Sequence, residues 1–163
     1  MSFLRPTKDV FLRGPEFHLP ERVVTNDDLA RWMGAEIRAS WIEHRTGIRE
    51  RRWAAQHEAV SDLAAAAAAK LLAKHPSARA GIRNLVLATI SGDFPTPPTS
   101  PLLQHRLGLA DCGAFDVGAA CSGFVSALHV GASLALATSE AQLVVAADIR
   151  SKFLNPADFS TAV

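Results

Sequence analysis

Three apolar runs without polar alternation constrain the fold of this chain more than any other feature. They span Leu85–Thr89, Ala114–Val117 and Leu143–Ala147. Because successive side chains of a strand point to opposite faces of a sheet, unbroken apolar runs predict strands that are covered on both faces, as parallel strands are. Helical stretches near 100–107 and 121–138 lie between these runs, so the order of elements predicts βαβ units in an α/β layered domain.

Length, composition and charge narrow the class of protein. The chain has 163 residues, close to the roughly 150 residues of one domain. Hydrophobic residues make up 48% and charged residues 20%, a globular composition that excludes a disordered chain. The 17 Lys and Arg against 16 Asp and Glu give a net charge of +1, which does not indicate a nucleic-acid partner.

Location and metal binding can also be predicted from the sequence. Unbroken apolar runs are too short for a membrane span, and residues 1–11 lack the order of a signal peptide. Cys112 and Cys121 form neither a CxxC pair nor a cluster at zinc spacing. We therefore expect a cytoplasmic protein without membrane contact, disulfide or metal site.

Capping residues predict the ends of two further helices. Thr25 or Asn26 can cap a short helix with two aspartates in its first turn, and Gly34 can end that helix. Ser61 is expected to cap a helix that runs to about Lys74. Short strands are expected at 10–12 and 48–53.

The helix predicted at 121–138 carries apolar or small residues all round. Phe124, Val125, Leu128 and Leu134 do not gather on one face. A helix of this kind is normally buried from every side, whereas a single βαβ sheet covers only one. The sequence therefore predicts a buried helix that also packs against something outside this sheet.

The segment Ala114–Phe124 combines a buried strand, a tight turn of small residues, a cysteine and the start of a helix. The turn places Cys121 at or near the helix N-terminus, where free N–H groups and the helix dipole stabilise an anion. A thiolate at that position, with small neighbours that leave room for a ligand, is a strong acyl-accepting nucleophile. The same residues also fit a buried structural cysteine, so both interpretations stay open at this point.

Two long motifs resemble a known family. The residues of Ala114–Phe124 resemble the nucleophile motif of β-ketoacyl-acyl carrier protein synthase III, a thiolase-like condensing enzyme. Trp41–Arg51 is similar to a second motif of that family, in the same order and at a fitting distance. Asp148 and Asn155-Pro156 also match. The resemblance covers essentially all of residues 1–163 but only the N-terminal half of a family member.

This resemblance implies a thiolase-like fold of two pseudo-symmetric α/β halves that pack their central helices together, with the C-terminal half absent from this chain. It implies that Cys121 accepts an acyl group from a coenzyme A or phosphopantetheine thioester, with no other cofactor. The acyl group then condenses with the carbanion of a decarboxylated malonyl thioester, in fatty-acid or polyketide-type biosynthesis. A histidine and an asparagine of the second half assist that step, and none of the six histidines here matches the role. Family members are usually homodimers.

The resemblance also supplies four substrate-binding candidates. Trp41 and Arg45 match positions that hold coenzyme A, since an indole can stack on adenine and a guanidinium can pair with phosphate. Phe159 stands where the family's Asp-Arg-Gly-Thr segment has an arginine, and it could form another wall of an aromatic clamp. Thr96 stands where some members have a phenylalanine, so we expect a longer or wider acyl pocket and a specialised synthase.

Alternatives to a condensing enzyme remain open from the sequence. The chain could serve simple acyl transfer without condensation, or it could be a non-catalytic partner half of a heteromeric synthase. Arg45, Arg49, Arg51 and Arg52 form the one basic concentration. Such a group is most often a solvated face, and if functional it suits an acidic partner such as an acyl carrier protein.

Overall fold

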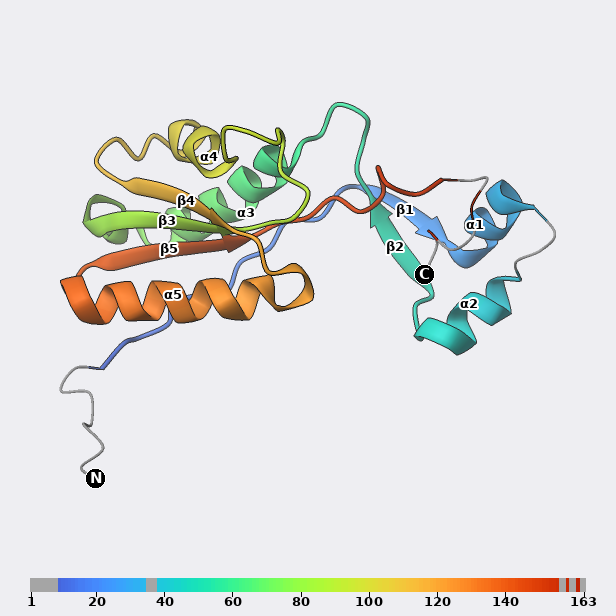
Figure 1. The fold of residues 1–163 in the computed structure, drawn as a ribbon, viewed down its shortest axis with the longest axis horizontal. Coiled ribbons are helices and arrows are strands. Elements are labelled where there is room, and N and C mark those ends of the chain that lie inside the picture. The colour runs from blue at the N-terminus through green and yellow to red at the C-terminus, as the bar shows by residue number, and fades with distance from the viewer. Residues whose placement is uncertain (1–8, 35–37, 156–157, 159–160, 162–163) are drawn as a thin grey trace, which may run out of the picture. The chain divides into compact units, whose positions relative to one another are not determined.

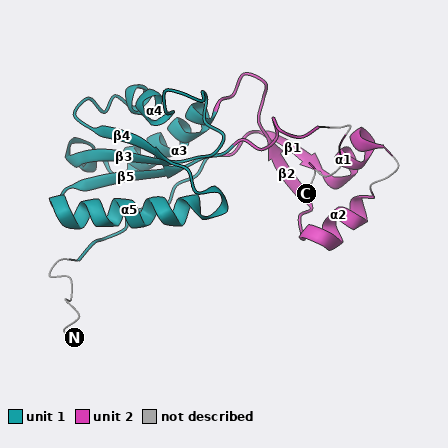
Figure 2. Ribbon diagram, in the orientation of Figure 1, with its two compact units in different colours: residues 1–18, 60–148 teal, residues 19–59, 149–163 magenta. Residues whose placement is uncertain are grey.

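The chain forms two compact units (Figure 2). The first contains residues 1–18 and 60–148, and the second contains residues 19–59 and 149–163. A computed structural model describes residues 9–34, 38–155, 158 and 161.

The first unit is built on a three-stranded parallel sheet with the order β4-β3-β5 (Figure 1). β3 spans Ile82–Ala88, β4 spans Gly113–Val117 and β5 spans Ala141–Ala146. In the centre of the sheet, Leu85 pairs with Ala114 on one side and with Leu143 on the other. The three strands predicted from the apolar runs are confirmed, with small shifts at their ends.

Helices cover both faces of this sheet. α5 (Gly123–Thr138) packs on one face, and α3 (Val60–Lys74) and α4 (Ser100–Leu107) pack on the other (Figure 1). Side chains of β3 point alternately to the two faces of the sheet, so they contribute to the apolar cluster on each face. Leu85 and Leu87 join the apolar cluster under α3 and α4, whereas Val86 and Ala88 join the cluster under α5.

The sheet covers α5 on one side. Gly123, Ala127 and Gly131 are buried at a spacing of four residues, and a Cβ on Gly131 would lie only 2.6 Å from Val144 Cγ2. On another side, Phe124 is 49% exposed and Val125 is 68% exposed. The helix therefore differs from the one expected to be buried from every side, because α3 and α4 lie across the sheet from it. The expected second cover is not among the elements that the structure describes.

Residues 120–138 form one helical stretch of 19 residues that is long and apolar enough to cross a membrane. The expectation that no segment has this length and composition is therefore wrong. On its buried side the helix packs along β5, β3 and β4. Packing of a helix along a parallel sheet is typical of an α/β layered domain.

The second unit pairs two short antiparallel strands with two helices. β1 spans Arg22–Thr25 and β2 spans Glu50–Trp53, in part of the predicted strand at 48–53. α1 spans Asn26–Met33 and α2 spans Ala39–Thr46. A small apolar cluster holds these elements together, made of Val24, Leu29 and Ile42 with Met33, Trp53 and Leu154 around them.

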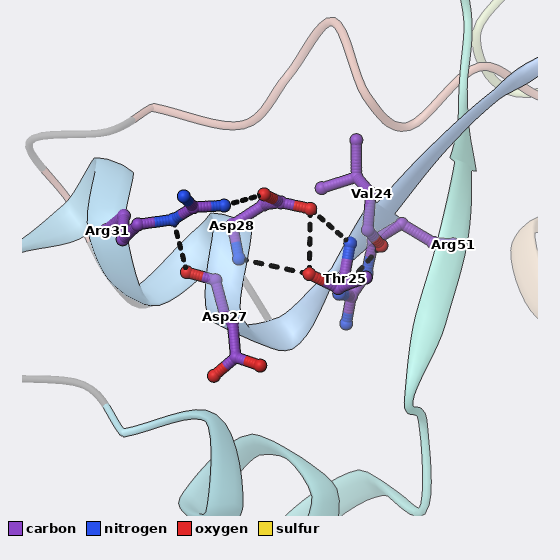
Figure 3. A network of polar contacts seen from close by, with 6 residues as sticks. All are labelled: Val24, Thr25, Asp27, Asp28, Arg31 and Arg51. Atoms are coloured by element: carbon purple, nitrogen blue, oxygen red, sulfur yellow. Dashed lines mark hydrogen bonds and ion pairs between the residues drawn. The ribbon is translucent and has the colours of Figure 1, made fainter.

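Thr25 caps α1, which confirms one of the two predicted caps (Figure 3). The Thr25 Oγ1 accepts a hydrogen bond from the Asp28 N–H at 3.2 Å, and the Thr25 N–H donates to Asp28 Oδ2 at 2.9 Å. Arg31 forms an ion pair with the same carboxylate. The hydrogen bonds from the Thr25 hydroxyl and N–H, helped by Arg31, hold the pKa of Asp28 below its ordinary value of 3.8. Gly34 ends the helix as predicted.

Asp28→Asn is expected to reduce the acid sensitivity of unfolding. Because the folded pKa lies below the unfolded one, the carboxylate stabilises the fold above pH 3.8, and this contribution is lost as the pH falls through the lower folded value. Urea unfolding is compared from neutral pH to well below 3.8. The difference in the free energy of unfolding between wild type and Asp28→Asn should disappear as the pH is lowered. Asp27→Asn, in the same turn, is the control. A difference in the free energy of unfolding between wild type and Asp28→Asn that does not depend on pH would contradict the prediction.

Two local expectations are wrong. α3 begins at Val60, so Ser61 lies inside its first turn. Its buried hydroxyl has no hydrogen-bond partner among the described residues, and the Ser61 N–H donates to Asp93 Oδ1 at 3.0 Å. The carboxylate of Asp93 therefore takes the capping role predicted for the Ser61 hydroxyl. The strand expected at 10–12 is not formed, and Phe11 is 83% exposed.

Candidate active site

Cys121 lies on the turn that joins β4 to α5, at the carboxyl edge of the parallel sheet. β4 ends at Val117, a single 3-10 turn covers Ala120–Ser122, and α5 begins at Gly123. The thiol is free and exposed. The predicted position of the cysteine at a helix start is confirmed. The carboxyl edge is also where open α/β sheets bind their ligands.

The turn before the cysteine is strained and tightly held. Ala120 has a φ of 44°, in the left-handed region that residues other than glycine rarely adopt. The N–H and the Oγ of Ser122 both donate to the Ala119 carbonyl, at 3.0 and 2.8 Å. Gly123 N–H donates to the Ala120 carbonyl. Strain of this kind persists where the surrounding structure fixes it, and it is enriched at functional sites.

The start of α5 can stabilise negative charge next to the thiol. Ser122 occupies the N-cap position but forms no side-chain cap bond, because its hydroxyl is directed to Ala119. The first N–H groups of the helix therefore carry no cap from Ser122. Such groups and the helix dipole favour an anion at this end. Chemically, the arrangement suits a thiolate and the oxyanion that forms when a thiolate attacks a carbonyl carbon.

Asp116 ties the strand that leads to Cys121 to the start of α4. Asp116 Oδ2 accepts from the Thr99 N–H at 2.9 Å, and Asp116 Oδ1 accepts from the Ser100 N–H at 2.9 Å. Thr99 Oγ1 in turn accepts from the Asp93 N–H at 2.9 Å. The loop between β3 and α4, which carries Thr96, is thereby fixed near its end.

The chain is similar to known proteins along most of its length. A family model described as 3-oxoacyl-[acyl-carrier-protein (ACP)] synthase III matches residues 115–163. A β-ketoacyl-[acyl-carrier-protein] synthase III of Deinococcus deserti is 42% identical over 147 residues, which are 90% of this chain and 41% of that protein. The acetoacetyl CoA synthase NphT7 of Streptomyces sp. is 41% identical over 150 residues, 92% of this chain and 45% of that protein.

A solved structure gives the same result for the fold. The crystal structure of 3-oxoacyl-(acyl carrier protein) synthase III from Pseudomonas aeruginosa matches with a TM-score of 0.81 and 40% identity, over 91% of this chain and 45% of that one. This chain is synthase III-like. It spans less than half the length of these relatives and corresponds to the N-terminal half, so the predicted resemblance and the thiolase-like α/β fold are confirmed.

The substrate-binding candidates of this synthase III-like chain fall into two groups. Thr96 is exposed on the loop between β3 and α4, in the same unit as Cys121. Trp41, 44% exposed, and Arg45 lie one turn apart on the same face of α2 in the second unit. Phe159 lies outside the described residues. The roles assigned to these four residues remain predictions.

Three of the four clustered arginines of this synthase III-like chain form ion pairs or hydrogen bonds with other residues of the chain. Arg49 Nε lies 2.8 Å from Glu43 Oε1. Arg51 donates to the Val24 carbonyl and Arg52 to the Pro20 carbonyl, at 3.4 and 3.2 Å. Contacts within the second unit therefore account for these three arginines. The idea of an acidic partner at this surface therefore depends on Arg45 and stays untested.

The sequence analysis assigned no role in the site to two aspartates near it, since Asp116 was not singled out and Asp148 was named only as a match to the family. Asp116 is the one charged residue in the predicted strand at 114–117, and Asp148 directly follows the predicted strand at 143–147. A carboxylate within or just after a buried strand costs free energy unless donors surround it. This conflict with the apolar pattern was the available signal that both side chains have fixed partners.

Cys112 provides an internal comparison for Cys121. It lies just before the amino end of β4 and is partly buried, and its Sγ donates to the Gly113 carbonyl at 3.2 Å. Burial raises the pKa of the Cys112 thiol. Since the thiolate is the reactive form, we expect the partly buried Cys112 to react more slowly than the exposed Cys121.

Iodoacetamide is expected to alkylate Cys121 before Cys112. The exposed Cys121 offers direct access at a helix start, whereas burial and a raised pKa both slow Cys112. Limited alkylation near neutral pH, followed by peptide mass spectrometry, gives the two rates in one sample. Faster modification of Cys112 would show that the turn at Cys121 does not promote thiolate reactivity.

Proposed function

We propose that this chain is the acyl-accepting half of a synthase III-type condensing enzyme, with Cys121 as the nucleophile. The observation that carries the proposal is the exposed thiol on a strained turn, at the carboxyl edge of a parallel sheet and at the start of α5. Two relatives named a β-ketoacyl-[acyl-carrier-protein] synthase III and an acetoacetyl CoA synthase support this class of reaction.

The first step is acyl transfer to the cysteine. The Cys121 thiolate attacks the carbonyl carbon of an acyl thioester, and a tetrahedral oxyanion forms beside the first N–H groups of α5. The bond from the acyl carbon to the carrier sulfur then breaks. The acyl group stays on Cys121, and the carrier leaves as a thiolate that takes a proton from solvent.

The second step is decarboxylative condensation. A malonyl thioester loses carbon dioxide, the resulting carbanion attacks the acyl carbon, and the bond to the Cys121 sulfur breaks to give a β-ketoacyl thioester and the free thiolate. A histidine and an asparagine in a C-terminal half would assist this step, since this chain spans less than half of its relatives. Without decarboxylation, the same acyl-cysteine would serve simple transfer to another nucleophile.

Substrate and assembly follow from the same proposal. Trp41 and Arg45 would hold the nucleotide of coenzyme A, with Phe159 as a further wall, or the phosphopantetheine would arrive on an acyl carrier protein. Thr96 would border an acyl pocket longer or wider than one closed by phenylalanine. The enzyme would act in the cytoplasm as a homodimer, in fatty-acid or polyketide-type biosynthesis.

The test uses the protein at its full natural length. Incubation with acetyl- or octanoyl-coenzyme A should add the mass of one acyl group, and later addition of malonyl-coenzyme A should release carbon dioxide and remove that mass. Acyl uptake without carbon dioxide release would support simple transfer. Absence of uptake from these donors and from an acyl carrier protein donor would favour the non-catalytic partner half and overturn the proposal.

A further inference from the structure

Asp148, directly after β5, collects four hydrogen bonds on one carboxylate oxygen. Asp148 Oδ1 accepts from Thr89 Oγ1 at 3.1 Å and from the Ile90 N–H at 2.9 Å. The same oxygen accepts from the Ser91 N–H at 3.1 Å and from Ser91 Oγ at 2.7 Å. Consecutive N–H groups that converge in this way form an anion-binding concavity, and here the chain fills that concavity with its own carboxylate.

Residues 89–91, which donate hydrogen bonds to Asp148, also lie next to the turn that leads to Cys121. Thr89 is buried, and its N–H donates to the carbonyl of Val117, the last residue of β4, at 3.3 Å. A Cβ on Gly118 would lie 3.9 Å from the Thr89 carbonyl oxygen. The residues after β3 therefore contact the point at which the chain leaves β4 towards Cys121.

The order of strands makes this connection continuous. β3 lies between β4 and β5, so the loop that follows β3 is flanked by the residues that follow both neighbours. The Ala147 N–H donates to the Ala88 carbonyl at 3.1 Å, which fixes the backbone beside Asp148 to the end of β3. Asp148 thus holds the loop after β3 from one side, and that loop holds the end of β4 on the other.

We propose that Asp148 is a positioning residue for Cys121, acting as a hydrogen-bond acceptor that fixes residues 89–91 and, through Thr89, the start of the turn at 118–121. This inference rests on the proposed function of Cys121. Asp148 takes no part in proton transfer. Its effect is on the placement of the sulfur, and displacement of a reacting group by about 1 Å can cost about 100-fold in rate.

The test compares Asp148→Ala with Asp148→Asn in the full-length protein. Single-turnover acylation by acetyl-coenzyme A should slow about 10- to 100-fold in Asp148→Ala, with the donor concentration at half-maximal rate unchanged. Asp148→Asn keeps an acceptor oxygen and should recover most of the rate. Equal slowing in both variants would indicate a proton acceptor and overturn the proposal. Asp111→Ala, an exposed aspartate before β4, is the control and should match wild type.

The alkylation rate of Cys112 shows whether Asp148→Ala displaces only the turn at Cys121 or destabilises the whole unit. In Asp148→Ala, the rate of iodoacetamide alkylation should change at Cys121 and stay constant at Cys112, since Cys112 lies at the opposite end of β4. A rise at both thiols overturns positioning. Should Asp148→Ala fail to fold, Thr89→Val removes one of the four donors and should slow acylation in the same direction.

Failure of this inference is distinguishable from failure of the proposed function. A wild-type protein that takes up no acyl group contradicts the role of Cys121 itself. A wild-type protein that is acylated at the same rate as Asp148→Ala leaves the role of Cys121 intact and contradicts only the role of Asp148.

Discussion

Cys121→Ala is expected to abolish the gain of one acyl mass that the full-length enzyme shows with acyl-coenzyme A. The methyl group of alanine fills part of the space of the thiol but offers no nucleophile, so the covalent intermediate cannot form. Because the Cys121 side chain is exposed, the substitution should leave the free energy of unfolding within about 0.5 kcal/mol of wild type. Loss of acylation would therefore reflect chemistry and not unfolding.

Cys112→Ala is the matched control for that experiment. It removes the other thiol of the same unit, which lies at the far end of β4 and has a raised pKa because of burial. Acylation of Cys112→Ala should equal that of wild type. Unchanged acyl uptake by Cys121→Ala would exclude Cys121 as the acceptor. Lost uptake by Cys112→Ala in a folded protein would contradict a role for Cys121 without Cys112.

Asp116→Ala is expected to lower the free energy of unfolding by about 2–6 kcal/mol. The substitution removes the acceptors of the Thr99 and Ser100 N–H groups, and both of these residues are buried. A buried donor left without a partner costs about 1–3 kcal/mol, and two donors are affected. The variant also frees β4 from the start of α4, so acylation at Cys121 should slow as well.

Urea unfolding of Asp116→Ala, Asp116→Asn and Asp111→Ala measures this effect. Asp116→Asn retains one acceptor oxygen and should be intermediate. Asp111→Ala, for which no side-chain bond is found among the described residues, should stay within about 0.5 kcal/mol of wild type. Equal stability of Asp116→Ala and wild type would mean that the carboxylate does not hold the start of α4.

Local patterns predicted those elements whose causes lie within one segment. The apolar runs at 85–89, 114–117 and 143–147 became the parallel strands because both faces of the sheet are covered by helices. Thr25, one of the two residues predicted as the cap of α1, caps the helix through Asp28, which is only three residues away. In both cases the pattern and its physical cause occupy the same stretch of chain.

Elements that depend on distant partners were not predicted. The N–H of Ser61 is satisfied by Asp93, and the loop at 89–91 is ordered by Asp148, each from a position far away in the sequence. The strand expected at 10–12 needed a neighbouring strand, and none of the described strands pairs with it. The helix α5 was expected to be covered on all sides, but which side the chain itself covers depends on the sheet order.

The candidate site divides in the same way. The small residues before Cys121 predicted a turn into a helix, and that local geometry is confirmed. The left-handed φ of Ala120 was not visible in the sequence, because no local pattern marks it. The hydrogen bond from Thr89 to the end of β4 was not visible either, because it joins segments far apart in the chain. Trp41 and Arg45 were named through family resemblance alone, and their shared face on α2 adds a geometric reason to test them together.

Mapping the acyl group by peptide mass spectrometry tests the role of Cys121 most directly. The full-length protein is incubated with acetyl-coenzyme A, digested, and treated with or without neutral hydroxylamine, which cleaves thioesters. The account predicts one acetyl group on the peptide that contains Cys121, removed by hydroxylamine. An acetyl group on a different residue, or one that resists hydroxylamine, would contradict it.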